Sequence, residues 1–151
     1  MPQSLCQIYI HLIFSTKNRT PNLIPAVHEP LRAYLGGILR GLDSPSLAIG
    51  CTDDHVHILY THGKNILIPD LIMHVKKDSS KWLKTQGPKF AQFHWQAGYG
   101  AFSVSASRVP AVKRYITDQP AHHHKDFSFQ DEFRRFLKQY RIEYDERYVW
   151  D

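Results

Sequence analysis

The sequence predicts an α+β sandwich, in which helices pack on an antiparallel sheet and further helices follow at the C-terminus. Three observations favour this class. Segments with the two-residue apolar period of strands alternate with segments of helical period. Two strand-like segments are separated by only two residues, which is the spacing of a hairpin. The length of 151 residues is that of one ordinary domain. We therefore expect one domain over residues 1–151, with a core at about residues 5–120 and a helical extension at about residues 121–151.

The N-terminal half supplies the first strand, the first helix and the hairpin. Residues 6–15 are rich in β-formers, with apolar side chains at alternate positions. A helix is expected over residues 26–40, because apolar residues recur there at helical spacing and Gly41 is suited to end it. Residues 46–52 and 55–61 are predicted to be two strands joined by a tight turn.

The C-terminal half supplies a helix, a short strand and two more helices. Residues 69–84 have one apolar face and one face rich in lysine. Residues 100–105 are predicted to be a strand, and residues 109–119 a helix with a proline in its first turn. Residues 129–140 form a helix with a stripe of phenylalanine and leucine. The aromatic and charged residues 141–151 are expected to pack back on the body or on a partner chain.

The resulting order, β-α-β-β-α-β followed by helices, is the split β-α-β pattern of a ferredoxin-like sandwich. Two helices are expected to cover one face of the sheet. The other face stays open unless the C-terminal helices cover it. This architecture hosts many functions, so the activity has to come from particular residues.

Composition excludes several classes of protein. Apolar residues make up 42% and charged residues 22%, which is a globular composition. The sequence has no apolar run long enough to span a membrane, and its first residues lack a signal-peptide pattern. Cys6 and Cys51 are too few for a disulfide scaffold, and we expect both to be reduced core residues of a cytoplasmic protein. The net charge of +5 favours a polyanionic partner only weakly.

The sequence contains ten histidines, and two of them form the sharpest local motif. His55 and His57 lie two residues apart on a predicted strand, so both imidazoles point to one face while Val56 and Ile58 point to the other. Two imidazoles at this spacing can bind one divalent metal ion. Taken alone, so short a motif more often marks an ordinary pair of strand histidines.

A second motif lies on the predicted helix over residues 109–119. Tyr115 and Gln119 are four residues apart, so the phenol and the amide share one helix face. Lys113 and Arg114 precede them and can hold a phosphate. A tyrosine on an amphipathic helix is more often a core or interface residue, so this motif is weak by itself.

Together the two motifs belong to a longer series that runs through most of the chain. The series comprises residues 11–17, 54–59, 77–82, 95–103, 115–119, 122–123 and 144–148. In that order, the sequence resembles the single-tyrosine HUH transposases. These are small transposases of insertion sequences that move as single-stranded DNA, and they include the REP-associated tyrosine transposases.

The resemblance implies an HUH-endonuclease type of ferredoxin-like fold and a DNA transposase activity. Tyr115 would be the nucleophile, and His55, His57 and Gln119 would bind Mg²⁺ or Mn²⁺. Single-stranded DNA with a hairpin would be cleaved and rejoined through a 5′-phosphotyrosine intermediate. The resemblance also implies a homodimer in the prokaryotic cytoplasm, associated with the nucleoid when bound to DNA and not with a membrane.

Further residues are candidates for DNA contact, because basic side chains bind phosphates and aromatic rings stack on bases. They are Lys17, Arg19, Lys76, Lys77, Lys81, Trp95, Tyr99, Lys113 and Arg114. A solvated helix face explains the lysine stripe equally simply, and a packed turn explains the aromatic residues. The run His122, His123 and His124 can add a ligand or contact DNA, but a solvated helix end is favoured.

Two other functions remain open at this point. One is a non-catalytic single-stranded nucleic-acid-binding module on the same fold, which would need stacking aromatic residues on an open sheet face. The other is a zinc-dependent hydrolase that uses the histidines and a water nucleophile. The hydrolase leaves Tyr115 without a function, and the central strand carries histidines where the binding module would need aromatic rings.

Overall fold

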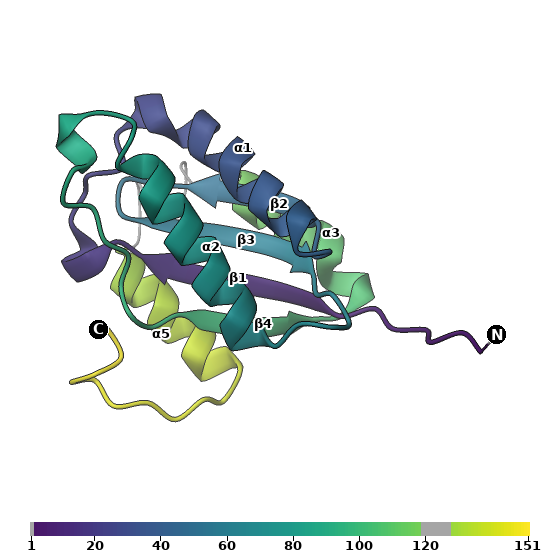
Figure 1. Ribbon diagram of the computed structural model, residues 1–151. Helices are drawn as coiled ribbons and strands as arrows, with labels where there is room; N and C mark the ends of the chain where they lie inside the picture. Colours follow the sequence, from purple (N-terminus) through teal and green to yellow (C-terminus); the bar gives the residue numbers. More distant parts are fainter. Residues whose placement is uncertain (1, 119–127) are drawn as a thin grey trace.

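The computed structural model describes residues 2–118 and 128–151 and contains a four-stranded antiparallel sheet flanked by helices (Figure 1). The strand order is β2-β3-β1-β4, with β1 Tyr9–Ser15, β2 Ser46–Cys51, β3 His55–Thr61 and β4 Gly100–Val104. The helices are α1 Pro25–Gly41, α2 Ile68–Leu83, α3 Val109–Thr117 and α5 Phe129–Gln139. None of these described helices is long and apolar enough to cross a membrane. The predicted ferredoxin-like α+β class is confirmed.

The alternation of side chains along the central strands separates the molecule into two layers. Leu12 of β1 and Val56 and Ile58 of β3 belong to the core under α1 and α2. Successive side chains of a strand point to opposite faces. His55 and His57 therefore point away from this core, toward the layer formed by the C-terminal helices.

The first layer holds most of the apolar core, and Figure 1 shows α1 and α2 together on this side of the sheet. Leu31 and Leu35 of α1 are fully buried, as are Leu71 and Val75 of α2. Each pair is four residues apart, which places both side chains on one helix face. The predicted amphipathic faces are therefore the ones that pack on the sheet.

The second layer covers the sheet face that the sequence leaves open. Phe129, Phe133 and Leu137 recur every four residues along α5 and pack on Ile13 and Phe102. The apolar face of α3 packs on the same side of the sheet, against β2 and β3. An RNA-recognition type of binding module needs this face open. The described helices instead cover it.

The segment after α5 returns to the body, which is one of the two positions expected for it from the sequence. Val149 and Trp150 pack against the aromatic cluster of α5. The backbone N–H of Gly98 donates a hydrogen bond to the carbonyl oxygen of Asp151 at 2.7 Å. A Cβ at Gly98 would lie only 3.1 Å from that oxygen, so glycine permits this close approach.

The two cysteines differ in their environments. β1 begins at Tyr9 rather than at residue 6, and Cys6 is exposed, so the core position expected for Cys6 is wrong. Cys51 ends β2 and is buried as expected. Burial raises the pKa of the Cys51 thiol to about 12, so it stays a neutral, weakly reactive group at ordinary pH.

Candidate active site

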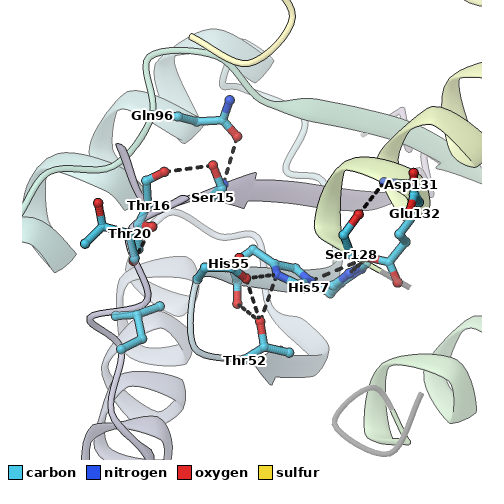
Figure 2. Close-up of polar contacts among 12 residues, drawn as sticks. Ser15, Thr16, Thr20, Thr52, His55, His57, Gln96, Ser128, Asp131 and Glu132 are labelled. Atoms are coloured by element: carbon cyan, nitrogen blue, oxygen red, sulfur yellow. Dashed lines mark hydrogen bonds and ion pairs between the residues drawn. The ribbon is translucent and has the colours of Figure 1, made fainter. Parts of the chain in front are cut away.

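Two imidazoles and a carboxylate meet on the sheet face that α5 covers (Figure 2). His55 and His57 come from β3, and Glu132 comes from the first turn of α5, 75 residues after His57. Nε2 of His57 lies 2.7 Å from Oε1 of Glu132, and Nε2 of His55 lies 3.5 Å from the same oxygen. All three side chains are buried. The predicted pair of histidines therefore has a charged partner from a distant part of the chain.

Neighbouring groups hold each imidazole by its other nitrogen. Nδ1 of His55 lies 2.6 Å from Oδ1 of Asp54 and 2.8 Å from Oγ1 of Thr52. Nδ1 of His57 lies 2.7 Å from Nε2 of the buried His11. Partners of this kind fix the orientation of metal-binding histidines. The Nε2 atoms of both rings are thereby aimed at the same carboxylate.

The buried charges of the site act on its histidines in opposite directions. Burial alone lowers the pKa of His55, but the carboxylates of Asp54 and Glu132 outweigh it and hold this pKa above its ordinary value. Burial and the neighbouring His57 lower the pKa of His11 well below its ordinary value. His11 is therefore a neutral support at physiological pH, whereas the environment of His55 favours positive charge.

Helix α3 brings the predicted nucleophile to the same place. The hydroxyl of Tyr115 donates a hydrogen bond to Oε2 of Glu132, while Oε1 accepts from His57. The ring centroids of Tyr115 and His57 are 5.8 Å apart. Burial and the negative charge of Glu132 raise the pKa of Tyr115 above its ordinary value, and the charge of Arg135 opposes them. Tyr115 is therefore a protonated phenol beside the two histidines.

Glu132 is the site residue that the sequence analysis missed. It lies next to Phe133 and three residues after Phe129, within the face of α5 that packs on the sheet. A carboxylate buried on such a face is costly unless it is hydrogen bonded or binds a cation. The signal for it is an acidic residue at a core position of an amphipathic helix. However, Glu132 lies in the first turn of the helix, where acidic residues are common, so the sequence alone does not distinguish it from an ordinary acidic residue at a helix start.

The three residues have the chemistry of a divalent metal site. Their potential ligand atoms all lie within 4.8 Å of one another. Two imidazoles and one carboxylate provide nitrogen and oxygen donors that suit several divalent ions. The predicted ligand Gln119 and the histidines at positions 122–124 lie outside the described residues. Glu132 is a donor that the predicted set did not contain.

Comparison with known proteins decides the family. Residues 4–119 match the family model of IS200-like transposases. The chain belongs to this family. A solved structure from Deinococcus radiodurans R1, described as that of a transposase, is 24% identical with a TM-score of 0.61 and covers 79% of this chain and 98% of its own. A REP-associated tyrosine transposase bound to a REP hairpin is 14% identical, with a TM-score of 0.60, and covers 82% and 73%. A search of curated proteins found no match.

The residues of the transposase's candidate site lie partly within and partly beyond the segment that the family model matches. His55, His57 and Tyr115 lie within that span. Glu132 lies beyond it, on α5. Helix α5, which covers the sheet face, therefore also supplies the carboxylate of Glu132 to the site residues that lie within the matched segment.

The basic candidates for DNA contact lie on both sides of the sheet. Lys113 and Arg114 are exposed on α3, the helix that carries Tyr115. Lys77 and Lys81 are exposed on α2, in the opposite layer. The α2 lysines are therefore not brought together with Tyr115.

Three further candidates lie in loops. Lys17 is exposed directly after β1. The guanidinium of Arg19 lies 5.8 Å from the ring centroid of Trp150, so it helps to hold the C-terminal segment. Tyr99 keeps 39% of its surface exposed, which leaves part of its ring accessible.

Two other candidates are structural residues of the transposase. Trp95 is buried against Phe14, and its indole N–H donates to Ser79 at 2.9 Å, so the base-stacking function expected for Trp95 is wrong. The ammonium of Lys76 donates to the carbonyl oxygens of Gln96, Ala97 and Gly98 at 2.8, 3.2 and 2.6 Å. Lys76 therefore closes the loop before β4, and the expectation that it contacts DNA does not fit this position.

Substitution of Lys76 by methionine is expected to lower the free energy of unfolding by about 2 kcal/mol, because the loop carbonyls lose a charged donor. Urea unfolding followed by circular dichroism measures the change. The matched control is Lys77→Met, which removes the same charge from an exposed neighbour and is expected to change stability by less than about 0.5 kcal/mol. Equal stability of the two variants would contradict the structural function of Lys76.

Proposed function

We propose that this transposase cleaves and rejoins single-stranded DNA through a covalent 5′-phosphotyrosine at Tyr115, with a divalent metal ion bound beside it. One observation supports this most directly: the hydroxyl of Tyr115 and the imidazole of His57 bind the two oxygens of a single carboxylate, Glu132. This contact supports the proposal because it joins the proposed nucleophile to a carboxylate that also contacts the buried His55 and His57, two potential metal ligands.

His55, His57 and Glu132 would hold the ion, and Gln119 is the further ligand that the family resemblance implies. The donor set fits, because both Nε2 atoms and a carboxylate oxygen face one point and the Nδ1 atoms have other partners. We propose Mg²⁺ or Mn²⁺ as the ion. A divalent ion in this position supplies positive charge that stabilises the phosphoryl oxygens and the departing oxygen.

The residues of the chain then account for the transfer. The oxygen of Tyr115 attacks the phosphorus and forms a new O–P bond, while the bond from phosphorus to the 3′ oxygen breaks. The phenol loses its proton and the 3′ oxygen gains one, so the products are a 5′-phosphotyrosine and a free 3′-hydroxyl. Attack by another 3′-hydroxyl reverses these steps. One phosphoester replaces another, so rejoining needs no ATP.

We also propose hairpin-bearing single-stranded DNA as the substrate, since the REP-associated relative is bound to a REP hairpin. Tyr115 contacts Glu132 of its own chain, which favours a site completed within one subunit. A homodimer would then serve to hold two DNA ends. Because Glu132 comes from the C-terminal extension, we propose that core and extension act as one catalytic domain, working on DNA in the prokaryotic cytoplasm.

Removal of divalent ions is expected to abolish the covalent adduct. The purified protein is mixed with a labelled hairpin oligonucleotide. The yield of protein–DNA adduct that survives denaturing electrophoresis is then measured. Adduct is expected with Mg²⁺ or Mn²⁺ and not with EDTA, because the charge on the phosphate is then unopposed. Adduct formation that proceeds equally in EDTA would contradict metal dependence, and cleaved DNA without any adduct would support a water nucleophile instead.

A further inference from the structure

A pocket of about 640 Å³ opens at the predicted nucleophile. Tyr115 and Glu132 form part of its wall, and the rest comes from His11 of β1, from β4, from α3 with the turn before it, and from α5 with the residue that follows it. Its size is that of a site for a small ligand. The residue that carries the proposed chemistry is therefore one of the walls of this pocket.

Two arginines line this pocket from different elements. Arg108 precedes α3, and Arg135 lies on α5. Arg135 follows Glu132 by three residues on α5, so the two side chains lie on the same side of the helix. A guanidinium binds phosphate through paired hydrogen bonds, so two of them around one cavity favour a phosphate-bearing ligand.

Part of the pocket wall is aromatic. Phe136 and Tyr140 line the pocket. The ring of Tyr140 stacks on Phe102 with centroids 4.7 Å apart, and its hydroxyl donates to the carbonyl oxygen of Ser103 at 3.1 Å. Aromatic side chains held in this way offer a firm surface for a sugar or a base.

We propose, resting on the function proposed for Tyr115, that this pocket binds one nucleotide of the DNA strand next to the cleavage position. Its phosphate lies at Arg135 and Arg108, and its sugar and base pack against Phe136 and Tyr140. Glu132 and Arg135 both follow the span that the family model matches, so α5 adds a substrate subsite to the family's core.

The first test measures binding of a fluorescein-labelled oligothymidylate of about ten nucleotides to the full chain by anisotropy, over a series of salt concentrations. Arg135→Gln is expected to weaken binding about five- to tenfold and to reduce the slope of log K against log salt by about 0.7. The matched control, Lys138→Gln, removes the same charge from an exposed position on α5 outside the pocket. Its affinity is expected to stay within about twofold of the parent. Equal loss in both variants would overturn the proposal.

A second variant fills the pocket without changing charge. Ala111 lines the wall, and Ala111→Trp is expected to weaken oligothymidylate binding by about as much as Arg135→Gln. Thymidine monophosphate is expected to displace the probe from the parent protein at lower concentration than inorganic phosphate does. Undiminished binding by Ala111→Trp, or equal competition by the two anions, would overturn a nucleotide subsite.

The outcome is separable from that of the proposed function. Adduct formation in Tyr115→Phe tests the nucleophile, and oligothymidylate binding by Arg135→Gln tests the subsite, so the two proposals are read from different variants and different measurements. If Tyr115→Phe still forms a covalent adduct, the nucleophile is wrong even when Arg135→Gln weakens binding. If Tyr115→Phe loses the adduct and Arg135→Gln binds normally, the nucleophile stands and the subsite is wrong.

Discussion

Tyr115→Phe is expected to reduce covalent capture of hairpin DNA to below detection while leaving the fold intact. The substitution removes only the hydroxyl, and the ring keeps its packing beside Ile116 in the cluster on β3 and β4. Without that oxygen no O–P bond can form, whatever else binds the phosphate. The measurement is the yield of adduct on denaturing gels after incubation with labelled hairpin DNA and Mg²⁺ or Mn²⁺.

The matched control for this result is Tyr34→Phe. Tyr34 lies on α1, in the opposite layer, and stacks on Trp82. Loss of its hydroxyl is expected to leave the adduct yield unchanged. Removal of the Tyr115 hydroxyl also takes one partner from the buried Glu132, so a stability cost of about 1 kcal/mol is expected in the first variant. An adduct at the parental level in Tyr115→Phe would contradict the proposed nucleophile.

His57→Ala is expected to lower the rate of adduct formation by about a thousandfold. Loss of an imidazole ligand weakens binding of the proposed metal ion. The ion's stabilisation of charge in the transition state, which is worth several kcal/mol, is then lost. His57 is also the residue that joins His11 to Glu132, so the variant leaves two buried polar groups with a lost partner. Single-turnover cleavage gives the rate, and titration with Mn²⁺ followed by calorimetry gives the metal affinity.

Two further variants separate the loss of a ligand from the loss of folding. His74→Ala removes an imidazole from α2, in the opposite layer, and is expected to cleave at the parental rate. His57→Gln keeps a polar side chain in the buried position, and it is expected to fold, by circular dichroism, while binding Mn²⁺ at least tenfold more weakly. A folded His57→Gln protein with parental Mn²⁺ affinity would contradict a metal site at the histidines.

Alternation along the strands made part of the site predictable. A strand with an apolar side chain between two histidines can bury the apolar residue only by turning both histidines to the other face. The structure has this arrangement, with Val56 in the first core and His55 and His57 in the second layer. The placement of Tyr115 beside them depends on how α3 crosses the sheet, and the family resemblance rather than local periodicity indicated it.

The remaining differences arise from tertiary packing that no local pattern encodes. Glu132 is recognised as a site residue only once α5 lies on β3. Trp95 looks like a loop aromatic in the sequence, but a β-bridge to Thr16 draws it into the core beside Phe14. Lys76 lies on the polar side of its helix, yet a loop that follows α2 folds over it. In each case a distant segment decides whether a side chain faces solvent.

The measurement that tests the account most directly is the chemical identity of the protein–DNA link. The adduct formed with hairpin DNA and Mg²⁺ or Mn²⁺ is digested with protease and nuclease, and the modified peptide is sequenced by mass spectrometry. We expect a nucleotide joined through its 5′ phosphate to the oxygen of Tyr115, together with a free 3′-hydroxyl on the released strand. A nucleotide on any other residue, or cleaved DNA with no linked peptide, would contradict the proposed mechanism.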